Sequence, residues 1–291
     1  MNHLEFEGIL TLFTVEDAIK TTGFLIKSYG KDVVVFIHGM GGNFYKEGFL
    51  KGARILKERG ISFFSFNSRG AEVVKDFSDM RGDHHLMGTA FEKFEECVMD
   101  IKGALNYLGS VGYKRFHLMG HSTGCQKILY YAYITGDERI KSLIHISPAD
   151  DYEIWKNYLG EDFEKIVKLA EEMVRRGDGD KLLLSLYEKN EDFWSARRFL
   201  SFASRANWEA RMFNYEDLSI FSQVKIPTFV ALGTEDEYFF KPVKWYANKL
   251  KDAYRGEKIR VEIMPGDHSF HGYEETLFLK IAYFIRGLEN D

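Results

Sequence analysis

The sequence predicts an α/β protein in which a doubly wound, mostly parallel sheet carries an inserted helical cap. Three observations support this fold class. Short β-rich runs alternate with helical patterns along most of the 291 residues, and such alternation is typical of a parallel sheet. The run KDVVVFIHG at residues 31–39 is almost continuously apolar, as expected for a strand covered on both faces. A charged, strand-poor stretch at residues 151–211 interrupts the alternation.

Eight strands follow from the local composition. The runs at residues 4–13 and 23–27 predict two antiparallel strands at the start of the chain. Six further β-rich runs complete the predicted sheet: residues 31–39, 61–67, 115–121, 141–147, 226–233 and 258–264.

Helices are expected between most of these strands. Apolar residues recur at steps of three and four from Phe91 to Leu108, which predicts one face of a long helix. Helical patterns also cover residues 45–59, 123–135, 242–252 and 273–285.

The charged stretch predicts a second structural part. Residues 151–211 contain 13 acidic and 11 basic residues and no proline, in a pattern that indicates several amphipathic helices. We therefore predict a core formed by residues 1–150 and 214–291, with a helical cap at residues 151–213 between the sixth and seventh strands. Ligands of open α/β sheets bind beyond the carboxyl ends of the strands. Functional residues are therefore expected directly after strands.

Composition and charge exclude several classes of protein. Lys and Arg number 39 against 44 Asp and Glu, a net charge of −5, which argues against an electrostatic grip on nucleic acid. No apolar run approaches the roughly 18 residues that a membrane span requires. The first residues, MNHLEFEGIL, carry glutamates where a signal peptide has basic residues. The sequence thus predicts a cytoplasmic protein. Its two cysteines cannot by themselves form a disulfide framework or a zinc site.

The most specific motif follows the predicted strand at residues 115–121. Gly120-His121-Ser122-Thr123-Gly124 matches the pattern G-x-S-x-G, in which small residues permit a sharp strand-to-helix turn that exposes the serine hydroxyl. An apolar strand before the motif and a helical run after it supply the context that this turn requires. We therefore predict Ser122 as a nucleophile. The alternative is an ordinary strand–helix corner with Ser122 as the helix N-cap.

A serine hydroxyl is a poor nucleophile without a general base. His268 follows the last predicted strand and precedes the final helix, so it is the predicted base. His271, three residues later, is the alternative. By contrast, His38, His121 and His145 lie in or beside strands and are expected to be structural.

The base needs a carboxylate that orients it, and in this architecture the acid lies between the serine and the histidine in the chain. Asp236 follows the seventh strand within Gly-Thr-Glu-Asp and is the predicted acid. Other carboxylates lie nearby or after the sixth strand: Glu235, Glu237, Asp150, Asp151 and Asp267.

Two backbone N–H groups are predicted to bind a developing oxyanion. One belongs to Thr123, the residue after the nucleophile, and the other to the loop after the third strand. That loop, residues 38–43, reads His-Gly-Met-Gly-Gly-Asn, and its glycines let the backbone approach a ligand closely. Met40 is the predicted donor and Gly41 the alternative. The loop lacks the Lys-Ser/Thr ending of a phosphate-binding loop and the spacing of a dinucleotide motif.

Taken together, these motifs resemble the α/β-hydrolase superfamily of serine esterases, lipases and peptidases. His-Gly, Gly-His-Ser-Thr-Gly, Gly-Thr-Glu-Asp and Gly-Asp-His follow the third, fifth, seventh and eighth strands, in the order that this superfamily uses. The resemblance extends from about residue 23 to the end of the chain, apart from the cap. The strings GHSTGCQ and FNSRG also resemble a subgroup that includes fungal hydrolases of siderophore esters.

The resemblance implies a serine hydrolase that cleaves a small-molecule carboxylic ester through an acyl-enzyme on Ser122. His268 would act as base and Asp236 as orienting acid, with no metal or organic cofactor. A serine at the elbow argues against haloalkane dehalogenase and epoxide hydrolase activity, because those relatives have aspartate there. The lipase-like string HGGG is replaced by HGMGG. Amide or peptide hydrolysis, acyl transfer by the same triad, and a small-molecule receptor on this fold remain alternatives.

Arginines at two places in the chain allow two interpretations. Arg69 follows the fourth strand, and an ion pair within the protein is favoured over a contact with a substrate anion. The later part of the cap interleaves arginines with aromatic residues, where a solvated basic helix face is favoured over a surface that attracts carboxylate substrates. These cap residues are Arg197, Arg198, Arg205 and Arg211.

Overall fold

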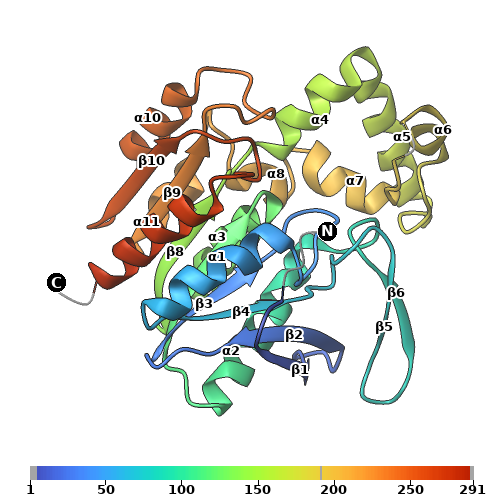
Figure 1. The fold of residues 1–291 in the computed structure, drawn as a ribbon. Coiled ribbons are helices and arrows are strands. Elements are labelled where there is room, and N and C mark those ends of the chain that lie inside the picture. The colour runs from blue at the N-terminus through green and yellow to red at the C-terminus, as the bar shows by residue number, and fades with distance from the viewer. Residues whose placement is uncertain (1–4, 191, 289–291) are drawn as a thin grey trace.

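The computed structural model describes residues 5–190 and 192–288. Its main sheet has eight strands: β1 (Ile9–Thr14), β2 (Lys20–Ile26), β3 (Asp32–Ile37), β4 (Ser62–Phe66), β7 (Arg115–His121), β8 (Ile140–Ile146), β9 (Thr228–Gly233) and β10 (Ile259–Met264). They are hydrogen-bonded in the order β1-β2-β4-β3-β7-β8-β9-β10 (Figure 1). The β1–β2 and β2–β4 pairs are antiparallel, and the other five pairs are parallel. The predicted fold class is confirmed.

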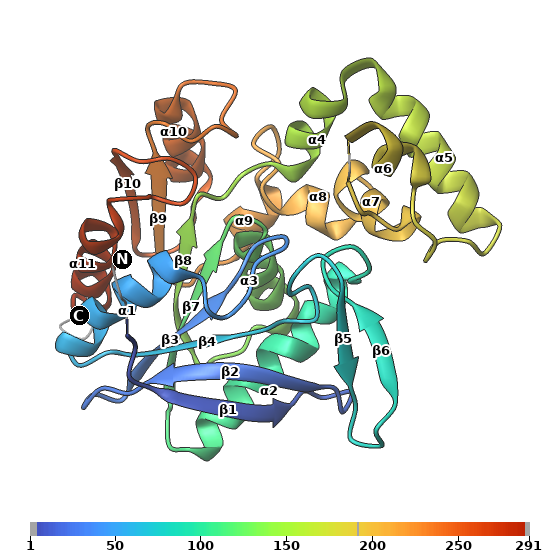
Figure 2. The same cartoon turned by 45° about the vertical axis from the view of Figure 1, so that its right-hand side comes forward.

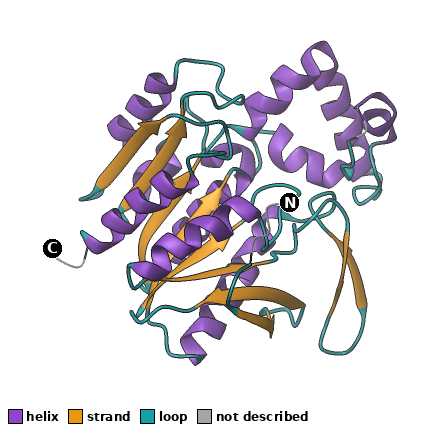
Figure 3. Ribbon diagram, viewed as in Figure 1, coloured by secondary structure: helices purple, strands orange, loops and turns teal. Residues whose placement is uncertain are grey.

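Helices cover both faces of the sheet, as the alternation of patterns predicts (Figure 3). The helices of the core are α1 (Glu47–Glu58), α2 (Cys97–Ser110), α3 (Thr123–Thr135), α9 (Ser219–Gln223), α10 (Val243–Ala253) and α11 (Glu274–Arg286), with a short 3₁₀ turn η1 (Phe94–Glu96) before α2. Apolar residues of α1 and α11 pack in one core cluster, and those of α2, α3 and α10 pack in another.

The position of strand β3 between two layers of helices explains why its sequence is almost continuously apolar. Every residue of β3 is buried. Val33 and Val35 point into the cluster beneath α2 and α3, whereas Val34 and Phe36 point into the cluster beneath α1 and α11. Because successive side chains of a strand face opposite sides, a strand covered on both faces needs apolar residues at every position.

One hairpin, β5 (Lys75–Ser78) with β6 (His84–Met87), was not expected from the sequence. Each strand has four residues, and of these eight only Phe77 is buried. Strands this short and polar carry no apolar alternation that a sequence pattern can detect. The hairpin projects from the sheet (Figure 2).

The segment between β8 and β9 begins with helices that gather beyond the end of β8 (Figures 1 and 2). These helices are α4 (Asp151–Leu159), α5 (Phe163–Arg175), α6 (Leu184–Asn190), α7 (Ala196–Ala203) and α8 (Trp208–Met212), with a 3₁₀ turn η2 (Gly160–Asp162). Phe163, Trp194 and Phe202 belong to an apolar cluster of their own. By contrast, Met212 and Phe213 lie in the core cluster that contains α3. The apolar cluster of this helical segment is thus separate from the core, while the end of the segment packs into the core.

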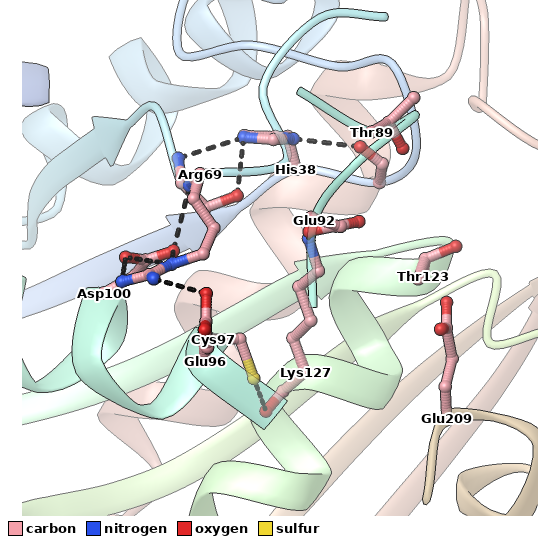
Figure 4. Close-up of polar contacts among 12 residues, drawn as sticks. His38, Arg69, Thr89, Glu92, Glu96, Cys97, Asp100, Thr123, Lys127 and Glu209 are labelled. Atoms are coloured by element: carbon pink, nitrogen blue, oxygen red, sulfur yellow. Dashed lines mark hydrogen bonds and ion pairs between the residues drawn. The ribbon is translucent and has the colours of Figure 1, made fainter. Parts of the chain in front are cut away.

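A buried ion network joins this helical segment to the core. Arg198 of α7 is completely buried and contacts two carboxylates, Glu92 at 3.1 Å and Glu209 at 2.8 Å. Lys127 of α3, also buried, lies 2.6 Å from the other oxygen of Glu92 (Figure 4). Burial opposes ionisation of Glu92, but Lys127 and Arg198 hold its pKa below the usual value. Neither interpretation offered for the cap arginines applies to Arg198, which faces neither solvent nor substrate.

Arg69 is also paired within the protein, which agrees with the favoured interpretation. Its guanidinium is buried and donates to the carboxylates of Glu96 and Asp100 (Figure 4). It also donates to the carboxylate of Asp17. The Nε and both Nη atoms take part in these bonds. The guanidinium therefore links the loop after β4 to α2 and to the β1–β2 connection.

The ion network predicts a large difference between two neighbouring arginines. Arg198→Met leaves Glu209 buried without a cation and Glu92 with Lys127 alone, so the free energy of unfolding should fall by about 4 kcal/mol. Arg197 is 44% exposed and pairs with the exposed Asp180, so Arg197→Met should cost only about 0.5 kcal/mol. Urea denaturation of both variants measures the difference. Equal losses of unfolding free energy in the two variants would contradict the conclusion that this ion network links the helical segment to the core.

Candidate active site

The turn between β7 and α3 holds Ser122 in an uncommon backbone conformation. Ser122 has φ 55° and ψ −131°, a region that residues other than glycine rarely adopt. The flanking glycines are needed because main chain crowds them. A Cβ on Gly120 would lie 2.3 Å from the Gly124 oxygen, and a Cβ on Gly124 would lie 2.2 Å from the Ile37 oxygen. The two glycines of the motif therefore allow α3 to begin directly against the end of β3.

The loop after β3 lies against this turn. A Cβ on Gly39 would lie 2.8 Å from the Ser122 Cβ and 3.4 Å from its Oγ. His38 holds the loop: the Ser68 N–H donates to Nε2, so Nδ1 carries the proton and donates to the Gly39 carbonyl at 2.9 Å. Burial, and next the charge of Lys127, lowers the pKa of His38 to about 4. The neutral imidazole is thus a structural element of the loop, as expected from the sequence.

Three backbone donors point to no protein acceptor at this edge of the sheet. Among the hydrogen bonds of residues 5–190 and 192–288, none uses the N–H of Met40, Gly41 or Thr123. Thr123 is the first residue of α3, where backbone N–H groups have no partner within the helix. The N–H groups of the predicted donor Met40 and of its alternative Gly41 are therefore both unused by the described part of the protein.

His268 and Asp236 come together from two separate loops. The Asp236 carboxylate, after β9, places both oxygens 3.0 Å from His268 Nδ1, in the loop after β10. The side chain of Asp236 is fully buried and that of His268 is 8% exposed. The Glu237 carboxylate accepts from the His268 backbone N–H at 3.2 Å, and the Tyr238 ring packs edge-to-face on the imidazole. The loop after β9 therefore contacts His268 at three places: its Nδ1 atom, its backbone N–H and the face of its ring.

The other ring nitrogen of His268 is free. Nε2 is buried and has no hydrogen-bond partner within the described part of the chain. No hydrogen bond joins it to the Ser122 hydroxyl. The two residues are nevertheless linked through a neighbour, since His121, adjacent to Ser122 in the chain, contacts the His268 carbonyl at 2.9 Å. Because β3, β7, β9 and β10 run parallel, the predicted residues that follow them share one edge of the sheet.

The alternative residues lie elsewhere or have other partners. The His271 side chain is 73% exposed and bonds Asp267. Asp150 pairs with Arg205, while Asp151 accepts from the Thr123 hydroxyl. Glu235 is exposed. Of the carboxylates considered, only Asp236 bonds the ring of His268 within the described residues.

Two residues beside His268 were not predicted as part of the site. His121 was interpreted as structural, and Lys46 carried no sequence signal. Lys46 Nζ lies 3.1 Å from the hydroxyl of Ser269 and 3.4 Å from Nδ1 of His121. Residues 46, 121 and 269 are far apart in the chain, so no local sequence pattern can predict that they lie close together.

The helical segment contacts the loop that follows β3. The Met40 side chain packs against the apolar cluster of this segment, which includes Trp194 and Phe202, and Trp155 packs against the same cluster. These three rings contact one another at centroid distances of 5.1–5.2 Å. One of the predicted oxyanion residues thus packs against the apolar cluster of the helical segment.

The described residues hold neither a candidate membrane span nor a candidate metal cluster. None of the helices there combines the length and apolarity needed to cross a bilayer. No group of three or more His, Cys, Asp or Glu side chains in the same part of the chain is arranged to hold a metal ion.

Comparison with known proteins relates the chain to one family and to several solved structures. A family model described as "Protein of unknown function (DUF1749)" matches residues 5–260. No curated protein matches the sequence. The siderophore hydrolase EstB from Aspergillus fumigatus superposes with a TM-score of 0.70 and 18% identity, covering 98% of each chain.

Two further structures have the same fold. Alpha/beta hydrolase domain-containing protein 10 from mouse has a TM-score of 0.65 and 19% identity, covering 96% of this chain and 99% of that one. The Pyrococcus furiosus esterase Pf2001 has a TM-score of 0.64 and 15% identity, covering 99% and 95%. At these identities the likeness shows the fold, and it confirms the α/β-hydrolase resemblance that the sequence motifs carry.

The crowded turn predicts that Gly124, inside α3, and Gly136, at its C-cap, differ in their tolerance of alanine. Gly124→Ala should lower the free energy of unfolding by about 3 kcal/mol, because its Cβ meets main chain that cannot move aside. Gly136, at the C-cap, has φ 55° but open space around it, so Gly136→Ala should cost about 1 kcal/mol. Urea unfolding compares the two variants. A larger loss of unfolding free energy in Gly136→Ala would contradict this reasoning. It would mean that the positive φ at the C-cap, and not the close contact with β3, determines which glycine tolerates alanine.

Proposed function

The chain belongs to the family described as "Protein of unknown function (DUF1749)", and from its α/β-hydrolase fold we propose that it is a serine hydrolase that cleaves carboxylic esters of small molecules. One observation carries the proposal: a buried carboxylate, Asp236, bonds Nδ1 of His268 and leaves Nε2 free. Both residues share a sheet edge with Ser122 at its strained turn. A carboxylate, an imidazole and an elbow serine in this order are the parts that acyl transfer through a serine requires.

In the proposed reaction, the Ser122 hydroxyl attacks the ester carbonyl while His268 Nε2 takes the hydroxyl proton. The Asp236 carboxylate keeps the proton of the neutral ring on Nδ1 and stabilises the imidazolium that forms. His268 then gives its proton to the departing alcohol, which leaves an acyl-enzyme on Ser122. A water molecule, deprotonated by the same nitrogen, attacks the acyl carbon, and His268 returns the proton to Ser122 as the acid departs.

The oxyanion of each tetrahedral intermediate would lie against backbone donors. Thr123 N–H is one, and Met40 N–H is the proposed second. Neither donor is used by the protein itself, and each such donor contributes about 3 kcal/mol to transition-state stabilisation in comparable enzymes. The bond from His38 to the Gly39 carbonyl supports this role, because it holds the loop in place before the substrate arrives.

Two observations support an ester substrate and a role for the cap. Two of the structural neighbours are an esterase and a siderophore hydrolase. We further propose that residues 151–213 act as a cap, whose aromatic cluster packs on Met40 beside the reacting carbonyl. The substrate group next to the carbonyl would then contact aromatic side chains.

A fluorophosphonate probe tests the nucleophile, because it reacts only with an activated serine beside oxyanion donors. We expect one label per chain, on Ser122, identified by peptide mass spectrometry. The label should be absent in Ser122→Ala and strongly slowed in His268→Ala.

Turnover completes this test, since a receptor with an intact triad also takes the label. The proposal expects many turnovers of a short p-nitrophenyl ester per labelled site. A label on another serine contradicts the site, whereas a single turnover at Ser122 favours a receptor or an acyl acceptor other than water.

The acid is tested by an isosteric pair of variants. Asp236→Asn should fold normally and lose about 10⁴-fold in kcat, because the amide favours the wrong imidazole tautomer. Glu235→Gln removes an exposed neighbouring charge and should change kcat by less than about 2-fold. Ester hydrolysis and thermal unfolding are measured for both. If Glu235→Gln caused the larger loss, the acid would be misassigned.

A further inference from the structure

Three side chains, Lys46, His121 and Ser269, form a continuous chain of contacts at the loop that carries His268. Nζ of Lys46, the residue before α1, lies 3.4 Å from Nδ1 of His121. Nε2 of His121, the last residue of β7, lies 2.9 Å from the backbone carbonyl oxygen of His268. Lys46 Nζ also donates to the hydroxyl of Ser269 at 3.1 Å. The loop that carries His268 is therefore contacted at two successive residues.

The partners determine where His121 carries its proton. A carbonyl oxygen only accepts hydrogen bonds, so Nε2 of His121 must carry the proton that it donates to His268. An ammonium only donates, so Nδ1 of His121 must offer its lone pair to Lys46. The electrostatics agree with this neutral form. Burial, and next the charge of Lys46, lowers the pKa of His121 well below its usual value. Burial also lowers the pKa of Lys46.

The contact between His121 and the His268 carbonyl matters because His121 is adjacent to Ser122 in the chain. His121 precedes Ser122, so one peptide unit and one hydrogen bond connect the nucleophile to the main chain of the base. Its ring is buried and packs against Phe49 of α1, with centroids 5.1 Å apart. The ring thus has little freedom to move, and its bond sets the distance between the end of β7 and the loop after β10.

We propose that His121 and Lys46 are positioning residues, which hold the His268 loop at the correct distance from Ser122. The inference rests on the proposed serine hydrolase function and deepens it. Asp236 and Glu237 restrain His268 from the loop after β9, while His121 and Lys46 restrain it from β7 and α1. Removal of the second pair should leave substrate binding intact and impair proton transfer, because the base moves away from the hydroxyl.

The first experiment compares two substitutions of His121. His121→Leu removes both hydrogen bonds and should lower kcat about 10- to 100-fold, the cost of a base displaced by about 1 Å. KM should change by less than about 2-fold, because a residue that only positions the base adds nothing to substrate binding. His121→Gln carries an amide N–H that can reach the His268 carbonyl, so it should recover most of the loss.

The second experiment compares two lysines of the same region. Lys46→Met keeps the length of the side chain but removes the ammonium, and it should lower kcat about tenfold with KM unchanged. Lys51 lies on α1, is 39% exposed and pairs with Glu47. Lys51→Met is the matched control and should have wild-type kcat. The rate of fluorophosphonate labelling at Ser122 should fall in the same order as kcat.

Three outcomes would overturn the proposal. Wild-type kcat in a folded His121→Leu variant shows that the bond has no part in positioning. Equal losses in His121→Leu and His121→Gln, with equal falls in unfolding temperature, show a packing role only. A change in KM without a change in kcat for Lys46→Met shows that this lysine contacts substrate.

A measurement without substrate separates this inference from the proposed function. In ¹⁵N-histidine-labelled protein near neutral pH, NMR should show the His121 proton on Nε2 and a lone-pair nitrogen at Nδ1. The Nδ1 resonance should shift in Lys46→Met and not in Lys51→Met, and its absence in His121→Gln assigns it. A proton on Nδ1 overturns the inference even in an active esterase. Absence of ester turnover with the expected tautomer overturns only the proposed function.

Discussion

The close contact between the end of β3 and the beginning of α3 is the constraint on which the rest of the candidate site depends. Gly124 lies against the Ile37 carbonyl, and Gly120 lies against Gly124, at distances that leave no room for a Cβ. This crossing forces the chain through the positive φ of Ser122 and brings the loop after β3 against the serine. The turn therefore brings the serine close to the loop after β3, which carries two of the unused backbone donors. The helices on both faces of the sheet support it by burying β3 completely.

Buried polar contacts connect the helical segment between β8 and β9 to this turn. The Thr123 hydroxyl donates to Asp151, the first residue of α4, and Gln126 donates to the same carboxylate oxygen. Burial and the charge of Glu209 raise the pKa of Asp151 well above its usual range. Further along, Arg198 contacts Glu92 and Glu209 out of contact with water. Ion pairs buried in this way add little to the free energy of unfolding. Removal of one partner lowers that free energy strongly, because it leaves an uncompensated buried charge. Such a network favours one placement of the helical segment against the core, since any shift would separate a buried charge from its partner.

The loop of His268 is restrained in a different way, by short contacts from several elements. Asp236 orients the ring, Glu237 holds the backbone N–H, and His121 holds the carbonyl. A general base must be held within a few tenths of an ångström of its proton donor to act efficiently. Because the loop follows the edge strand β10, it has no neighbouring strand on its outer side. Contacts from β7, α1 and the loop after β9 take the place of that strand.

Local patterns in the sequence determined the fold class and which residues follow which strand. The almost continuous apolar run of β3 and the G-x-S-x-G motif at Ser122 depend on residues close in the chain, so their spacing is readable without the structure. The same ordering places Asp236 and His268 after the last two strands. Only the tertiary structure decided which carboxylate bonds His268, and that Arg198 is buried rather than solvated. It alone brought Lys46 and His121 to the base. The physical reason is distance along the chain: Arg198 meets a carboxylate 106 positions away and His121 a carbonyl 147 positions away. Such pairs leave no periodic trace in a single sequence.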